Sequence, residues 1–223
     1  MGGVIGDILP LALGVAISPV PIIAVILMLF SKRAKGNGPA FLLGWITGLS
    51  AAFWIVYAIA GTADIATKSG PSRGASIVRL VLGVLLFIAA WRNWRKRREP
   101  GEEPAMPKWM STIDTITPIK SFGLATLLSG ANPKNLALTL AASMAVSQGG
   151  MGGGKSAIAF AVFLVIAIVS VAVPVMASLL LKEKSEKLLN GWKVWLAGNN
   201  ATGMFVLLLV FGVVLIGKGI AGL

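Results

Sequence analysis

Two short polar motifs interrupt long apolar runs, and they hold the residues best suited to bind a ligand inside a membrane. Asn132-Pro133-Lys134-Asn135 lies in the run from Ser121 to Gln148, and Ser18-Pro19-Val20-Pro21 lies in the uncharged run from Ile8 to Ser31. Ser and Asn favour the position before a helix, and Pro favours its first turn. A proline inside an unbroken helix costs about 3 kcal/mol. We therefore expect both helices to end at these motifs and to restart.

Restarted helices of this kind predict an anion site. A helix N-terminus presents unpaired backbone N–H groups and a partial positive charge. Two such N-termini would converge near the bilayer midplane, where Lys134 adds a full charge. A carboxylate, phosphate or sulfate would fit there, and the expected substrate-binding residues are Ser18, Pro19, Val20, Pro21, Asn132, Pro133, Lys134 and Asn135. The alternative is a structural kink in which backbone carbonyls neutralise Lys134.

Two further sets of polar residues extend this hypothesis. Thr47, Thr139 and Ser143 can line a pathway, although each alone is more often an interhelical hydrogen bond. The cluster Arg95-Lys96-Arg97-Arg98 can hold anionic lipid headgroups on the cytoplasmic side. The alternative for this cluster is an ordinary basic cytoplasmic loop.

Absent residue types exclude several kinds of chemistry. The chain has no His and no Cys, and its eight acidic residues all fall in loops or at span ends. We therefore expect no metal site, no cofactor and no enzyme activity, because no nucleophile–base pair or ligand set lies in the membrane. The run Gly149–Ser156 matches the consensus sequence of a phosphate-binding loop. It joins two membrane helices, however, so we predict a flexible turn there.

The elements that must position these motifs are membrane helices. Of 223 residues, 56% are hydrophobic and only 13% are charged, which is typical of an all-α polytopic membrane protein. At about 20 residues per span there is room for six. The predicted spans are 8–30, 39–61, 75–91, 121–147, 156–181 and 199–217, with Arg79 reaching the outer interface and Lys182–Leu196 lying along the inner membrane surface.

The distribution of basic residues predicts the orientation. Fourteen of the 20 Lys and Arg residues fall in three alternate loops, which should therefore face the cytoplasm. Both termini are then outside. The same loops account for the net charge of +12 without a nucleic-acid partner.

The two halves of the chain resemble each other. Leu13–Ile23 aligns without gaps on Leu127–Ala137, so that Ser18 matches Asn132 and Pro19 matches Pro133. Three spans per half require the second half to be inverted, which predicts a 3+3 inverted repeat with helices 1 and 4 broken. We expect a first repeat at 1–94, a cytoplasmic linker at 95–118 and a second repeat at 119–223. In span 2, Gly44 and Gly48 predict close helix packing, within the chain or between two copies.

These motifs resemble the LysE superfamily of membrane exporters. Gly14–Ile22, with its Ser-Pro-Val-Pro, and Gly130–Leu136, with its Asn-Pro-Lys, carry the resemblance, which covers nearly the whole chain. Within the superfamily the chain most resembles the GAP or Sap-like branch of glycolipid-addressing proteins. That resemblance implies a bacterial inner membrane protein that transports or delivers amphipathic glycolipids. Amino-acid exporters usually have Pro-Gly-Pro where this chain has Val20 as the middle residue.

Together these observations predict an exporter or flippase-like carrier for an anionic amphiphile or (glyco)lipid. One alternative is export of a small polar solute such as an amino acid, and another is a non-transporting accessory subunit of a larger lipid exporter. The expected partners are membrane lipid, the anionic or small-molecule substrate, and either a second copy of the chain or larger lipid-export machinery.

Overall fold

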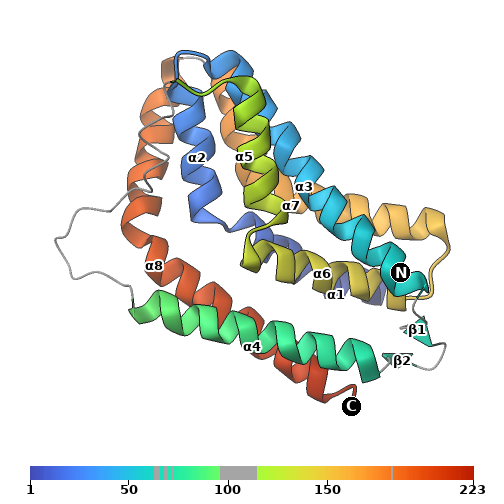
Figure 1. Ribbon diagram of the computed structural model, residues 1–223. Helices are drawn as coiled ribbons and strands as arrows, with labels where there is room; N and C mark the ends of the chain where they lie inside the picture. The colour runs from blue at the N-terminus through green and yellow to red at the C-terminus, as the bar shows by residue number, and fades with distance from the viewer. Residues whose placement is uncertain (63–65, 68–69, 72, 96–114, 182) are drawn as a thin grey trace.

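The computed structural model describes residues 1–62, 66–67, 70–71, 73–95, 115–181 and 183–223, and these residues are almost entirely helical (Figure 1). Two strands of two residues each, β1 (Ala66–Thr67) and β2 (Gly70–Pro71), pair antiparallel. The predicted linker lies largely outside the described residues, because 96–114 are not among them. The helices are α1 (Gly2–Ala16), α2 (Pro19–Phe30), α3 (Ala34–Thr62), α4 (Arg73–Arg95), α5 (Pro118–Gly130), α6 (Pro133–Gln148), α7 (Gly153–Leu181) and α8 (Glu183–Ile220).

The helix lengths confirm a multi-pass membrane protein but not six spans. Among the described residues, α3, α4, α7 and α8 are each long and apolar enough to cross a membrane. The pair α1 and α2, bent by 52°, is a fifth candidate. The pair α5 and α6 is not among the candidates, so the sixth span and the 3+3 repeat are not confirmed.

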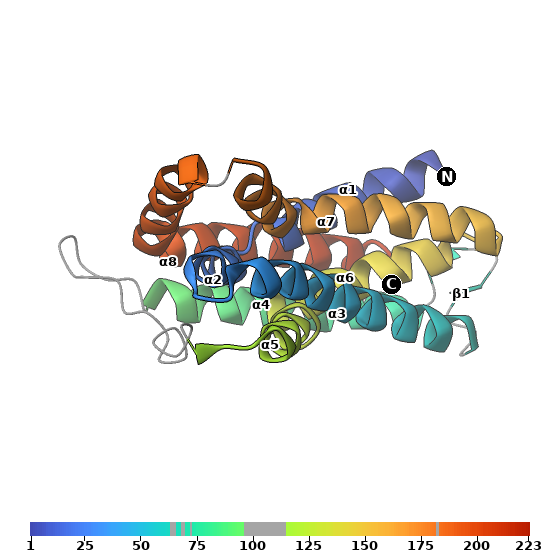
Figure 2. The ribbon, with the colours of Figure 1, turned by 90° about the horizontal axis from the view of Figure 1, so that it is seen from above.

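Glycines bring two helix pairs close together within the chain. α5 packs along α3, and α4 packs along α8 (Figures 1 and 2). A Cβ at Gly44 would collide with the carbonyl oxygen of Phe122, and one at Gly48 with Ser129 Oγ. A Cβ at Gly83 would lie 2.7 Å from the side chain of Ile216. The Gly44–Gly48 pair therefore packs against α5 of the same chain.

The helix α8 differs from the prediction. We expected a surface helix up to Leu196 followed by a separate span, but one helix of 38 residues runs through both segments and bends along its length (Figure 1). The sequence Ala197-Gly198-Asn199-Asn200 contains no proline to stop it. Asn199 Nδ2 also donates to the carbonyl of Trp195, 2.9 Å away and one turn earlier. The two segments therefore form one helix rather than two, while the position of Lys182–Leu196 along the inner membrane surface stays a prediction.

Two features hold the remaining helices in place. Trp45 of α3 is fully buried, and its Nε1 lies 3.4 Å from the carbonyl oxygen of Ala167 on α7. At the start of α3, Asn37 Nδ2 donates to Ser31 Oγ at 2.9 Å and to the carbonyl of Ile116 at 3.1 Å. Ser121 Oγ of α5 donates to the carbonyl of Asn37 at 2.7 Å. This polar cluster fixes the α2–α3 turn against the beginning of α5.

Candidate functional site

The first helix breaks where the sequence predicts, between α1 and α2. Ser18 has an extended backbone, with φ −126° and ψ 93°, and Pro19 begins the next helix. In a continuous helix the amides of residues 19 and 21 would serve the carbonyls of Val15 and Ile17, but proline has no amide hydrogen. The Ser18 hydroxyl lies 2.7 Å from the Val15 carbonyl and takes over that role. Ser18 therefore occupies the expected capping position of α2 but does not cap that helix. Its side chain instead donates a hydrogen bond to the preceding helix, α1.

The second break, between α5 and α6, also lies where the sequence predicts. α5 ends at Gly130, and Asn132 has an extended backbone with φ −67° and ψ 122°. Its side chain caps α6 by accepting from the backbone amide of Lys134 at 3.0 Å. Asn135 Nδ2 reaches back to the carbonyl of Leu128 on α5 at 3.2 Å. Polar side chains of the motif thus satisfy backbone groups on both sides of the break.

Lys134 joins the two breaks. Its Nζ donates to the carbonyls of Gly14 at 2.7 Å and Ile17 at 2.9 Å, and to Ser18 Oγ at 2.6 Å. These three bonds use all three ammonium hydrogens. They place the positive charge at the C-terminal end of α1, where the helix dipole favours a cation. This contact set, mostly to backbone carbonyls, is the one expected of a structural kink.

The junction of the two breaks is closed. Ser18 Oγ lies 3.1 Å from Asn135 Oδ1, and the exposed fractions of Ser18, Lys134 and Asn135 are 3%, 4% and 0%. We refer to these three residues as the junction. A ligand reaches the ammonium only if some of its present acceptors move away. The structure thus brings the predicted residues together, while ligand binding there stays a prediction.

The predicted pathway residues do not all meet. Thr139 and Ser143 are fully buried on α6, and Ser143 Oγ donates to the carbonyl of Phe53 at 2.8 Å. Thr139 Oγ1 has no hydrogen-bond partner among the described residues. Thr47 is exposed and bonds to the Leu43 carbonyl in its own helix. A shared pathway can therefore include the α6 pair but not Thr47 in this conformation.

The predicted headgroup cluster is only partly described. Arg95 ends α4, and its guanidinium carbon lies 5.9 Å from the centre of the Trp91 ring. Lys96, Arg97 and Arg98 lie outside the described residues.

A groove between α4 and α6 was missed by sequence reasoning. It has a volume of about 490 Å³ and is almost wholly apolar apart from Arg92 and Asn93 of α4. Since α4 and α6 run in opposite directions (Figure 1), these two residues lie at the same end as Pro133, beside the second break. We call this the α4–α6 groove. Its apolar lining residues are Leu82, Leu85, Leu86, Ile88, Ala89, Pro133, Leu136, Ala137 and Leu140.

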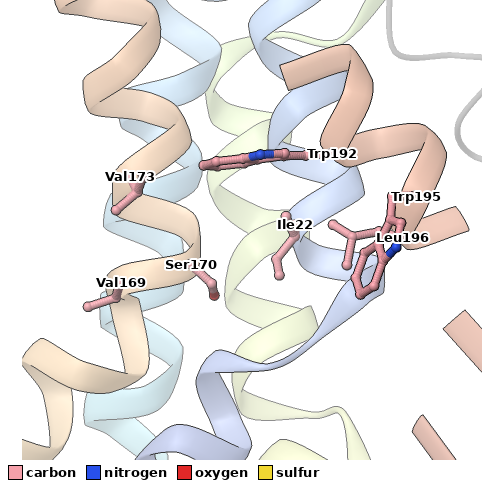
Figure 3. Close-up of a pocket in the computed structure, with 7 residues that line it drawn as sticks. All are labelled: Ile22, Val169, Ser170, Val173, Trp192, Trp195 and Leu196. Carbon is pink, nitrogen blue, oxygen red and sulfur yellow. The ribbon is translucent and has the colours of Figure 1, made fainter. Parts of the chain in front are cut away.

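A second cavity, of about 410 Å³, lies between α2, α7 and α8 (Figure 3). The Trp192 ring closes one end of it, and Trp195 and Leu196 face Ile22 from α8. Ser170 Oγ is its polar atom from α7 and has no hydrogen-bond partner among the described residues. Ile22 and Leu136 occupy equivalent positions in the alignment of the two halves, so each broken helix lines one apolar cavity just after its break.

Comparison with known proteins gives one family. The family model described as Sap, sulfolipid-1-addressing protein, matches residues 8–221, a stretch that includes both breaks and both apolar cavities. No curated protein and no solved structure gave a match to the chain.

Proposed function

The chain belongs to the Sap, sulfolipid-1-addressing protein, family, and from that premise we propose that it is an exporter or flippase-like carrier for an anionic amphiphile or (glyco)lipid. A sulfolipid combines apolar chains with an anionic headgroup. Its carrier therefore needs an apolar surface for the chains beside cationic residues for the headgroup. We also propose that the protein belongs to the LysE superfamily, with its halves as an inverted repeat and both termini outside the bacterial inner membrane.

The observation that carries this proposal is the α4–α6 groove with Arg92 and Asn93 at its end. In a bilayer an apolar groove gives little net binding, because lipid tails are as apolar as leucine. Selectivity must therefore come from the polar end. A guanidinium donates two parallel hydrogen bonds to a sulfate, phosphate or carboxylate, and Asn93 supplies an amide beside it.

The junction is the proposed crossing point for the headgroup. Anionic oxygens accept stronger hydrogen bonds from an ammonium than neutral carbonyls do. A headgroup that reaches Lys134 would therefore compete with the carbonyls of Gly14 and Ile17 and free the end of α1. In that state the headgroup would lie between the N-termini of α2 and α6, against Ser18–Pro21 and Asn132–Asn135. The closed junction is then the resting state of the carrier.

Transport by the purified protein in liposomes tests the proposal. Lipids labelled with a quenchable fluorophore on an acyl chain are incorporated in trace amount, and a membrane-impermeant reductant bleaches those in the outer leaflet. We expect the protein to expose nearly all of an anionic sulfatide to bleaching, but only the outer-leaflet fraction of the neutral galactosylceramide. Lys134→Ala and Arg92→Gln should return the bleached fraction to that of protein-free liposomes. Lys120→Ala, an exposed lysine on α5, is the matched control.

Other results would overturn the proposal in distinct ways. Equal movement of the neutral lipid would remove the anionic selectivity. Efflux of a labelled amino acid without movement of lipid between the leaflets would favour a small-solute exporter. An inactive purified protein that co-purifies from cells with a larger lipid-export assembly would identify it as an accessory subunit.

A further inference from the structure

A third cavity holds charged residues that the proposed function has not used. It has a volume of about 450 Å³ and lies between α1, α4, α6 and α8, at the end of α6 far from the break. Its polar lining consists of Asp7, Arg79, Gln148 and Lys218. We call it the Arg79 pocket.

The charges of the Arg79 pocket favour an anion. Lys218 Nζ and Asp7 Oδ1 form an ion pair at 2.5 Å, with both side chains about half exposed. This pair balances itself, and the carboxylate that would repel an anion is thereby offset. Asp7 also attracts the half-buried guanidinium of Arg79, so one carboxylate faces two cations in the pocket. Two cations and one carboxylate leave the pocket with a net positive charge.

Gln148 supplies unused donors beside that guanidinium. Its Oε1 accepts from Arg79 Nη2 at 2.5 Å, which fixes the orientation of the amide because an arginine cannot accept. Its Nε2 is consequently turned away from Arg79, is buried, and has no hydrogen-bond partner among the described residues. A buried donor without a partner is costly, so a ligand that draws the amide into the pocket and accepts from Nε2 would remove this penalty.

The pocket continues the line of the α4–α6 groove. The groove is lined by α6 as far as Leu140, and the Arg79 pocket begins at Ala141. Arg92 and Arg79 thus lie in two successive cavities along α4 and α6. Leu11 and Leu215 give the pocket an apolar wall, where the first carbons of an acyl chain can lie.

We propose that the Arg79 pocket binds the oxyanion of a lipid headgroup, through the Arg79 guanidinium and Gln148 Nε2. This inference rests on the proposed function, since it gives the carried amphiphile a second headgroup station at the far end of α6. Sulfate, phosphate and carboxylate headgroups share the required chemistry.

Binding measured by native mass spectrometry in detergent tests the proposal. The probes are sulfatide, the neutral galactosylceramide and inorganic sulfate. All variants carry Arg92→Gln, so that the groove end does not contribute. We expect sulfatide to bind at least about tenfold more tightly than galactosylceramide, and Arg79→Gln to abolish this preference, because only the sulfate brings a negative charge to the guanidinium. Arg73→Gln, on an exposed residue at the start of the same helix, should leave it unchanged.

A second variant and two outcomes keep the test decisive. Gln148→Ala should weaken sulfatide binding in the same direction, and elution as a single peak from size-exclusion chromatography checks that each variant is folded. A sulfatide preference that survives both Arg79→Gln and Gln148→Ala overturns the pocket but leaves the carrier function standing. Binding of inorganic sulfate without sulfatide overturns the headgroup assignment. Arg79-dependent binding, together with a wild-type protein that moves no lipid in the liposome assay, supports the pocket and overturns the carrier.

Discussion

Replacing Lys134 with methionine measures what holds the broken helix α1–α2 in place. Methionine keeps an unbranched side chain as far as Cε and removes the ammonium with its three donors. The carbonyls of Gly14 and Ile17 then lose their partners inside the closed junction. Ser18 keeps its contact with the carbonyl of Val15.

The expected cost follows from these contacts. Each buried carbonyl left without a partner costs about 1–3 kcal/mol. Removing the buried charge offsets part of this cost, because an ammonium is itself costly to bury. We therefore expect a net loss of about 2–4 kcal/mol. In a chain of 150–250 residues, 1 kcal/mol shifts the Tm by about 2–4 °C, so the Tm should fall by roughly 5–15 °C.

The assay is thermal unfolding of the detergent-purified protein, followed by the fluorescence of its seven tryptophans. Lys120→Met is the control, because that side chain is exposed on the first turn of α5. It should leave the Tm within about 1 °C, since exposed substitutions change stability little. A Tm for Lys134→Met that equals or exceeds that of Lys120→Met would refute the role assigned to the ammonium.

A double-mutant cycle sharpens the test. Ser18→Ala alone should cost about 1–3 kcal/mol, since it removes the donor to Val15 and the acceptor of Lys134. If Lys134 and Ser18 act as one unit, the double variant will lose less than the sum of the two single losses. Additive losses would show that the two residues act independently.

Three further measurements probe the rest of the fold. Gly44→Ala should lower the Tm sharply, because its Cβ would meet the backbone of α5, whereas Gly123→Ala, which meets nothing within 4 Å, should not lower it. Asn37→Ala should cost about 1–3 kcal/mol in unfolding free energy, since it removes two side-chain hydrogen bonds at the α2–α3 turn; no change in chemical denaturation would contradict this. In single-tryptophan variants, brominated lipids should quench Trp195, which is 65% exposed, and spare Trp45, which is fully buried.

The breaks could be predicted because proline acts locally. Pro19 and Pro133 follow residues that favour the position before a helix, and that local preference survives in the structure. The partners of Lys134 could not be predicted in the same way, because backbone carbonyls have no sequence signature. The prolines do contain a hint, however. Pro21 guarantees that the Ile17 carbonyl lacks a helical partner, and Lys134 supplies it.

Features that depend on tertiary packing could not be predicted from the sequence. The α4–α6 groove exists because two helices separated by an undescribed linker lie antiparallel, which no local pattern specifies. The hydrogen bond from Arg79 to Gln148 of α6 also depends on packing, and the position of Arg79 at the outer interface stays a prediction. The continuation of α8 through Gly198 depended on the absence of a proline, a weaker indication than the amphipathic pattern that suggested a separate helix.

The bond between Lys134 and Ser18 joins positions 116 residues apart, and this has a consequence for biosynthesis. A ribosome delivers Ser18 and its exposed carbonyls to the membrane long before Lys134 has been translated. During that interval the first helical pair has no ammonium to complete it and must rely on water, lipid headgroups or the insertion machinery. The contacts that complete the first break therefore form only after α6 arrives, so the folding of the first half depends on the second.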